Sequence, residues 1–207
     1  MPSDWTAYYH AFRKDAHLLL WQGYIAARPS INGALQEPDI TGLIADAIDE
    51  FLDSPDADER FDRYEVHEEK PLSTEGRLGK RRRRTDILIK SNLHRPRHKY
   101  IFEAKKIDGL PSVRGSYLGT EGILRFIVGE YGSASSDAAM VGYVIKSTVR
   151  QLKGVIRDEL AKQRNMLNFI GNIKNETVNA DLEIDVTCHM RTEKDEIRIS
   201  HIILDCC

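Results

Sequence analysis

The sequence predicts a mixed α/β fold, and three patterns support that class. In the first quarter of the chain, apolar residues recur every three or four positions, which is typical of helices. The middle contains short runs rich in β-branched residues, which favour strands. Further on, apolar strands alternate with helical patterns. Because hairpins are antiparallel whereas helix-linked strands can be parallel, we expect a sheet of mixed direction.

The periodic segments predict four helices, over residues 4–27, 38–52, 117–131 and 147–170. The second begins at a proline, which is favourable at the first position of a helix. Each of the four carries an apolar stripe that must be buried against another element. We therefore expect the helices to flank the sheet.

Six strands are expected between and after these helices. They are predicted over residues 64–67, 85–89, 100–105, 140–145, 182–190 and 197–204. A loop containing Pro96 joins the second strand to the third as a hairpin. The fourth strand is almost wholly apolar, which places it in the centre of the sheet. The last two form a C-terminal hairpin that either completes the sheet or forms an interface.

The composition is that of one globular domain. With 207 residues, 41% hydrophobic and 30% charged, the chain is long enough for a single core and is not of disordered type. No apolar run approaches the roughly 20 residues that a membrane helix needs, and the first residues do not resemble a signal peptide. We expect a cytoplasmic protein. Three cysteines without a C-x-x-C pair argue against a zinc site or a disulfide framework.

The net charge of −2 hides a strongly basic run. Six cations fall within eight residues: Arg77, Lys80, Arg81, Arg82, Arg83 and Arg84. Arg95, Arg97 and Lys99 follow. A basic block on a nearly neutral chain favours a surface that binds a polyanion, although a solvated loop gives the same pattern.

The strand over residues 100–105 carries the most informative chemistry. Because strand side chains alternate between faces, Glu103 and Lys105 project together from an otherwise apolar strand. Asp86 stands on the preceding strand, also among apolar neighbours, and a hairpin can bring it onto the same face. Burying such charges is unfavourable unless they are paired or bind a metal. Two carboxylates and a lysine suit Mg²⁺ or Mn²⁺ and phosphodiester hydrolysis.

Asp86 followed on the next strand by Glu103-Ala104-Lys105 resembles the PD-(D/E)XK nuclease superfamily, which includes restriction endonucleases and Holliday-junction resolvases. The resemblance implies that Asp86 and Glu103 bind the metal and that Lys105 is the catalytic lysine. Position 85 is Thr85, where many members have a proline. The basic run of residues 77–84 leads directly into Asp86, so those cations would hold the phosphate backbone.

The resemblance also implies a restriction-endonuclease-like fold. Its αβββαβ core covers roughly residues 37–150, with an extra helix over residues 4–27 and a C-terminal helix and hairpin over residues 147–207. All of these belong to one domain of 207 residues.

Further site residues are less clearly defined by the sequence. The superfamily often adds an acidic residue from its first core helix, and Glu37 is preferred here over Glu50 because it continues the apolar stripe. Glu121 and Arg125 are four residues apart and either contact the site or form a surface ion pair. Lys106 points to the opposite strand face, where we expect a solvated or phosphate-contacting lysine rather than the catalytic one.

Taken as a whole, the sequence predicts a metal-dependent nuclease. The resemblance favours DNA over RNA, a prokaryotic defence or restriction role, and control by self-association or by a regulatory protein. Three alternatives stay open. The chain could be an RNA-cleaving member of the same fold, a catalytically silent nucleic-acid-binding or scaffold subunit, or an unrelated α/β interaction domain.

Overall fold

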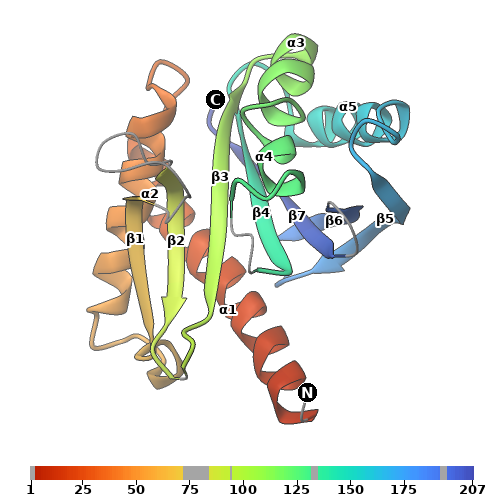
Figure 1. Cartoon of the computed structure of the whole chain (residues 1–207). Helices are drawn as coiled ribbons and strands as arrows, with labels where there is room; N and C mark the ends of the chain where they lie inside the picture. Colours follow the sequence, from red (N-terminus) through yellow and green to blue (C-terminus); the bar gives the residue numbers. More distant parts are fainter. Residues whose placement is uncertain (1–2, 72–83, 94, 132–134, 192–194) are drawn as a thin grey trace.

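The computed structural model describes residues 3–71, 84–93, 95–131, 135–191 and 195–207. Within these ranges the chain forms a seven-stranded mixed sheet with the order β1-β2-β3-β4-β7-β6-β5. Helices pack on both faces of this sheet (Figure 1). The predicted α/β class with a mixed sheet is therefore confirmed.

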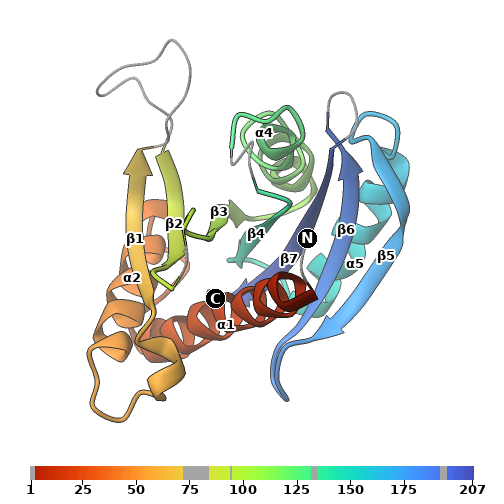
Figure 2. The ribbon, with the colours of Figure 1, turned by 60° about the horizontal axis from the view of Figure 1, so that its bottom comes forward.

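Two long N-terminal helices cover one face of the sheet. They are α1 (Ser3–Ala27) and α2 (Glu37–Leu52), and both lie within one residue of the predicted bounds. α2 buries a stripe that includes Ile40, Ile44 and Ile48. Gly23 of α1 lets the helices approach closely, because a Cβ there would lie 2.4 Å from Ile48 Cγ1. Figure 2 shows α2 beside the first strands and α1 crossing beneath the sheet towards α2.

The first three strands form an antiparallel meander. They are β1 (Tyr64–Pro71), β2 (Arg84–Ser91) and β3 (Lys99–Ile107). In the hairpin of β2 and β3, Leu88 lies opposite Ile101 and Ile87 opposite Phe102. The same register carries Asp86 and Glu103 onto one face, as the sequence predicts.

The remaining strands complete the sheet. The central strand is β4 (Asp137–Val144), which is buried along its whole length and runs parallel to β3 and β7. It is followed by β5 (Phe169–Thr177), β6 (Glu183–Met190) and β7 (Glu196–Asp205). The predicted C-terminal hairpin is thus β6 and β7, and β7 pairs with β4 inside the sheet.

Two predicted helices differ from the structure. Of the helix expected over residues 117–131, only α4 (Ile123–Ile127) forms, together with the last residue of a π-helical turn over residues 113–117. That turn follows directly on α3 (Leu110–Ser112), which lies before the predicted range. Tight chain reversals cause the break: a Cβ at Gly119 would lie 1.8 Å from the carbonyl oxygen of Gly115.

The other helix, α5 (Val149–Lys162), ends eight residues before its predicted end, and the strand β5 takes up residues assigned to it. Asn168 has a left-handed backbone (φ 46°) directly before β5, and the segment gains pairing with β6. Tertiary pairing therefore overrides the helical spacing.

The sheet separates two hydrophobic cores. One contains α1, α2 and inward residues of β3 such as Phe102 and Ala104. The other contains Ile101 of β3, residues of α4 and α5, and Met140 of β4. No helix in the described ranges is both long enough and apolar enough to cross a membrane.

Candidate active site

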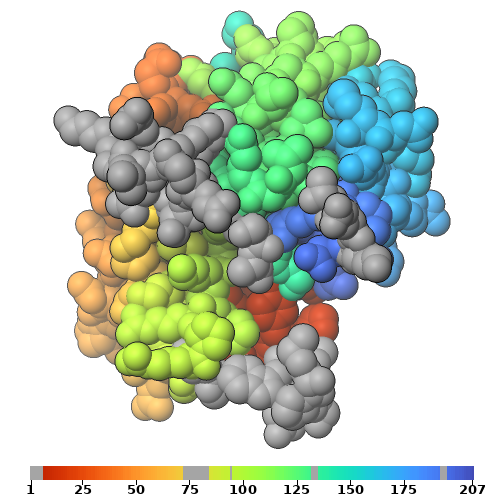
Figure 3. Space-filling view, viewed as in Figure 1, coloured from red at the N-terminus to blue at the C-terminus, as the bar shows by residue number. Residues whose placement is uncertain are grey.

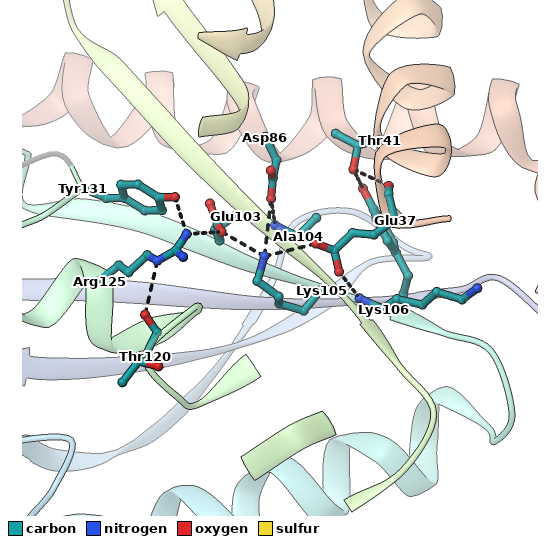
Figure 4. A network of polar contacts seen from close by, with 11 residues as sticks. Glu37, Thr41, Asp86, Glu103, Ala104, Lys105, Lys106, Thr120, Arg125 and Tyr131 are labelled. Carbon is teal, nitrogen blue, oxygen red and sulfur yellow. Dashed lines mark hydrogen bonds and ion pairs between the residues drawn. The ribbon is translucent and has the colours of Figure 1, made fainter. Parts of the chain in front are cut away.

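Three predicted site residues meet at the middle of β3. The Lys105 ammonium lies 2.9 Å from Glu103 Oε1 and 4.0 Å from Asp86 Oδ2 (Figure 4). Asp86 Oδ2 also accepts a hydrogen bond from the backbone N–H of Ala104, at 2.6 Å. This bond ties the aspartate of β2 to the strand that carries the other two residues.

Glu37 joins this cluster from the first residue of α2. Its Oε1 lies 3.2 Å from the Lys105 ammonium, and its Oε2 accepts from the backbone N–H of Lys106 at 2.7 Å. Pro38 fits the first turn of the helix, and Thr41 donates to the Glu37 carbonyl at 2.9 Å. Glu50 is exposed near the other end of α2. Of the two acidic candidates, the structure brings Glu37 to Lys105.

Lys106 has a different place from the one expected. Its ammonium donates to the carbonyl oxygens of Gly33, at 2.9 Å, and Leu35, at 2.6 Å. Those bonds hold the loop that leads into α2. Two of its three donors are used in this way, so Lys106 has a structural role in that loop, and its contact with phosphate stays a prediction.

Arg125 reaches the cluster from α4. Its Nη1 lies 3.4 Å from Glu103 Oε1 and donates to the hydroxyl of Tyr131 at 2.6 Å, while its Nε donates to the carbonyl of Thr120. Glu121 lies in the turn before α4, so the helical spacing expected for it and Arg125 does not exist. The sequence pattern did not single out Tyr131, which lies six positions after Arg125 and beyond the end of α4 at Ile127, where the helical spacing no longer applies.

Burial controls the electrostatics of these carboxylates. Glu103 is only 1% exposed, and burial followed by the nearby Asp86 raises its pKa to about 8. Burial also raises the pKa of Asp86, although Lys105 opposes this. Burial would lower the pKa of Lys105, but the carboxylates of Glu103, Asp86 and Glu37 outweigh it and raise that pKa.

One oxygen of the cluster points to an additional ligand. Glu103 Oε2 is buried and has no hydrogen-bond partner among the residues that the structure describes. A buried carboxylate oxygen without a partner is unfavourable. Asp86 stands beside it, so two carboxylates are available to a divalent cation, and Mg²⁺ accepts one or two protein carboxylates because it keeps bound waters. Within the described part of the chain no group of three or more His, Cys, Asp or Glu side chains is arranged to hold a metal. The residues fit a hydrated metal held by two carboxylates.

Of the basic run predicted to bind nucleic acid, only Arg84 lies within the described residues. Arg77, Lys80, Arg81, Arg82 and Arg83 lie outside the described residues. Arg84 begins β2 and is half exposed, and its Nη1 lies 2.7 Å from Glu69 Oε2. The last residue of the basic run is therefore the first residue of the strand that carries Asp86.

Comparisons of the chain with protein-family models, with curated proteins and with solved structures find no match. The fold and the site define a mixed α/β protein with a lysine enclosed by three carboxylates at the centre of its sheet.

Proposed function

We propose that this protein is a metal-dependent nuclease of restriction-endonuclease-like fold that hydrolyses phosphodiester bonds of DNA. The observation that carries the proposal is the unpartnered, buried Glu103 Oε2, in a cluster with Asp86 and Lys105 on paired strands. A buried carboxylate oxygen without a partner is unfavourable, and a bound divalent cation would satisfy it. The resemblance of Asp86 and Glu103-Ala104-Lys105 to the PD-(D/E)XK motif supports the same assignment.

Each residue of the cluster then has a role. Asp86 and Glu103 would hold Mg²⁺ or Mn²⁺, which supplies Lewis-acid activation of water and of a phosphoryl oxygen. Lys105 carries a positive charge and can orient the attacking water or stabilise negative charge that develops on the phosphate. Glu37 holds the Lys105 ammonium in place from α2, at 3.2 Å. Arg125 neutralises part of the charge on Glu103, at 3.4 Å.

A catalytically silent nucleic-acid-binding or scaffold protein is the second candidate. It is favoured by the enclosure of Lys105 by three carboxylates, which is also what a structural ion cluster requires. RNA is the alternative substrate. A role in prokaryotic defence or restriction, and control by self-association or a regulatory protein, rest on the superfamily resemblance alone.

The test is cleavage by the full chain of supercoiled plasmid, linear duplex DNA and RNA, each with Mg²⁺, Mn²⁺ or chelator. We expect DNA cleavage that needs the metal and is lost in Asp86→Asn. The matched control is Lys146→Ala, which changes a lysine with a 68% exposed side chain and should cleave like the wild type. A folded wild-type chain that cleaves none of these substrates in either metal would refute the proposal and favour the silent alternative.

A further inference from the structure

In the candidate catalytic cluster Glu103 and Lys105 are buried, and Asp86 is the partly exposed member. The α1 and α2 helices cover one face of β1, β2 and β3, through residues such as Ile87 and Phe102. Because strand side chains alternate, Asp86, Glu103 and Lys105 project from the other face. On that face α4 lies beside β3 and β4, whereas no helix of the described residues lies over β1 or the far end of the hairpin of β2 and β3 (Figures 1 and 2).

Three cations stand at that far end. Lys99 begins β3 and, at a spacing of four residues, shares the face of Glu103. Arg95 and Arg97 are exposed in the loop directly before it. We call Arg95, Arg97 and Lys99 the hairpin cations. The end of the hairpin that carries them lies at the surface in the space-filling view (Figure 3).

The hairpin cations are not neutralised by ion pairs. Lys90, which lies opposite Lys99 in the hairpin, is bound to Glu65 at 3.0 Å. Among the residues that the structure describes, no carboxylate lies within ion-pair distance of Arg95, Arg97 or Lys99. Side-chain hydrogen bonds lower the pKa of Glu65 and Arg97 adds to this, but no described carboxylate pairs with Arg97 directly, so the three cations can still meet an external anion.

The opposite side of the same strands carries the opposite charge. Between Asp39 and Asp62, on α2 and the segment after it, nine carboxylate side chains are exposed against one exposed cation, Arg60. α2 packs on the face of the β1–β3 layer opposite the catalytic cluster, so its exposed carboxylates disfavour a polyanion on that face. The segment after α2 instead ends beside the hairpin, where the backbone N–H of Asn92 donates to the carbonyl oxygen of Arg63 at 2.8 Å.

We propose that the hairpin cations bind backbone phosphates of duplex DNA whose scissile phosphate lies at Glu103 and Lys105. This inference rests on the proposed nuclease function and adds the direction in which the substrate runs. Four residues of strand separate Lys99 from Glu103, which is about 13 Å at ~3.3 Å per residue. With a rise of ~3.4 Å per nucleotide, the contact falls about four nucleotides from the cleaved bond. The duplex therefore follows β3.

The test compares two triple variants of the full chain. Arg95→Gln/Arg97→Gln/Lys99→Gln removes the hairpin cations, and Lys146→Gln/Arg150→Gln/Lys174→Gln removes three other exposed cations. Fluorescence anisotropy with labelled duplex DNA in chelator gives the dependence of log K on log salt. We expect the first triple to lower the slope by ~0.9 for each lost contact, up to ~2.7, and the control triple to leave it unchanged. Cleavage KM should rise in the first triple while kcat changes little.

The outcomes separate this inference from the proposed function. Equal slopes for the wild type and the first triple, or an equal effect of the control triple, would overturn the inference even if the wild type cleaves DNA. A wild type that binds through the hairpin cations but never cleaves would keep the surface and remove the nuclease proposal. Tighter binding of single-stranded RNA than of duplex DNA, with the same three residues, would overturn the assignment to duplex DNA.

Discussion

Replacing Glu103 by glutamine should stabilise the metal-free protein. The substitution keeps the shape of a side chain that is 1% exposed and removes a charge whose second oxygen has no partner. Glu103 has a pKa of about 8 in the folded protein, against 4.5 as the ordinary value, because of its burial and of Asp86. Between these two pH values the folded state keeps a proton that the unfolded state has lost, so wild-type stability falls as the pH rises through this window.

The size of the effect follows from the two pKa values. Each pKa unit is worth ~1.4 kcal/mol, so the glutamine variant should exceed the wild type by up to ~1 kcal/mol at pH 5 and up to ~3 kcal/mol at pH 7, levelling off above pH 8. For a domain of this length, ~3 kcal/mol raises the melting temperature by roughly 6–12 °C. Mg²⁺ at tenfold its Kd should add ~1.4 kcal/mol to the wild type, and little to the variant.

Urea unfolding from pH 5 to 8, with chelator and then with Mg²⁺, measures both differences. Glu159→Gln is the matched control, because Glu159 is also buried but is bonded by Arg114 and Lys162, which lower its pKa to about 2. Its glutamine variant should be less stable than the wild type at pH 7. If Glu103→Gln is also less stable in chelator and keeps the full response to Mg²⁺, Glu103 is a structural ion-pair partner and the metal-site reasoning fails.

Three further predictions concern the loop before α2, the turn before α4 and the basic run. Lys106→Met should slow cleavage, because it loosens the loop that positions Glu37. In a Glu37→Gln background the same substitution should have no further effect on kcat, and additive losses of kcat would contradict this coupling. Gly119→Ala should lower the free energy of unfolding by about 3 kcal/mol, because the added Cβ would lie 1.8 Å from a backbone oxygen. Gly115→Ala is the control, since a Cβ there has open space. Equal free energies of unfolding for the two variants in urea would refute the packing argument. Neutralising residues 81–84 should weaken binding of duplex DNA similarly across sequences and lower the slope of log K against log salt by ~0.9 per lost contact. An unchanged slope in an anisotropy titration would show that the basic run does not contact the DNA.

Much of the site is encoded by local sequence pattern. Alternation along β3 puts Glu103 and Lys105 on one face, and a hairpin loop of fixed length brings Asp86 to the same face from β2. The apolar stripes of α1 and α2 and the wholly buried β4 are equally local signals. These features depend on periodicity, which the sequence carries directly.

Other features depend on contacts between distant segments. Residues 169 and 170 continue the helical spacing of the preceding segment, but pairing with β6 makes them the start of β5. In the sequence Lys106 does not differ from other lysines. Its ammonium binds the loop before α2 because the fold brings the carbonyl oxygen of Gly33 within 2.9 Å of it. Arg125 reaches Glu103 because tight glycine turns break the expected helix.

The sequence by itself therefore determined the fold class, the two helices that cover one face of the sheet, and the strands that carry Asp86, Glu103 and Lys105. Only the tertiary structure decided that Glu37 rather than Glu50 reaches Lys105, that Arg125 shares the Glu103 carboxylate, and that Glu103 Oε2 is left without a partner. The physical reason is that periodicity fixes which face of an element a side chain occupies. The packing of one element on another fixes which side chains meet, and how much water they lose when they do.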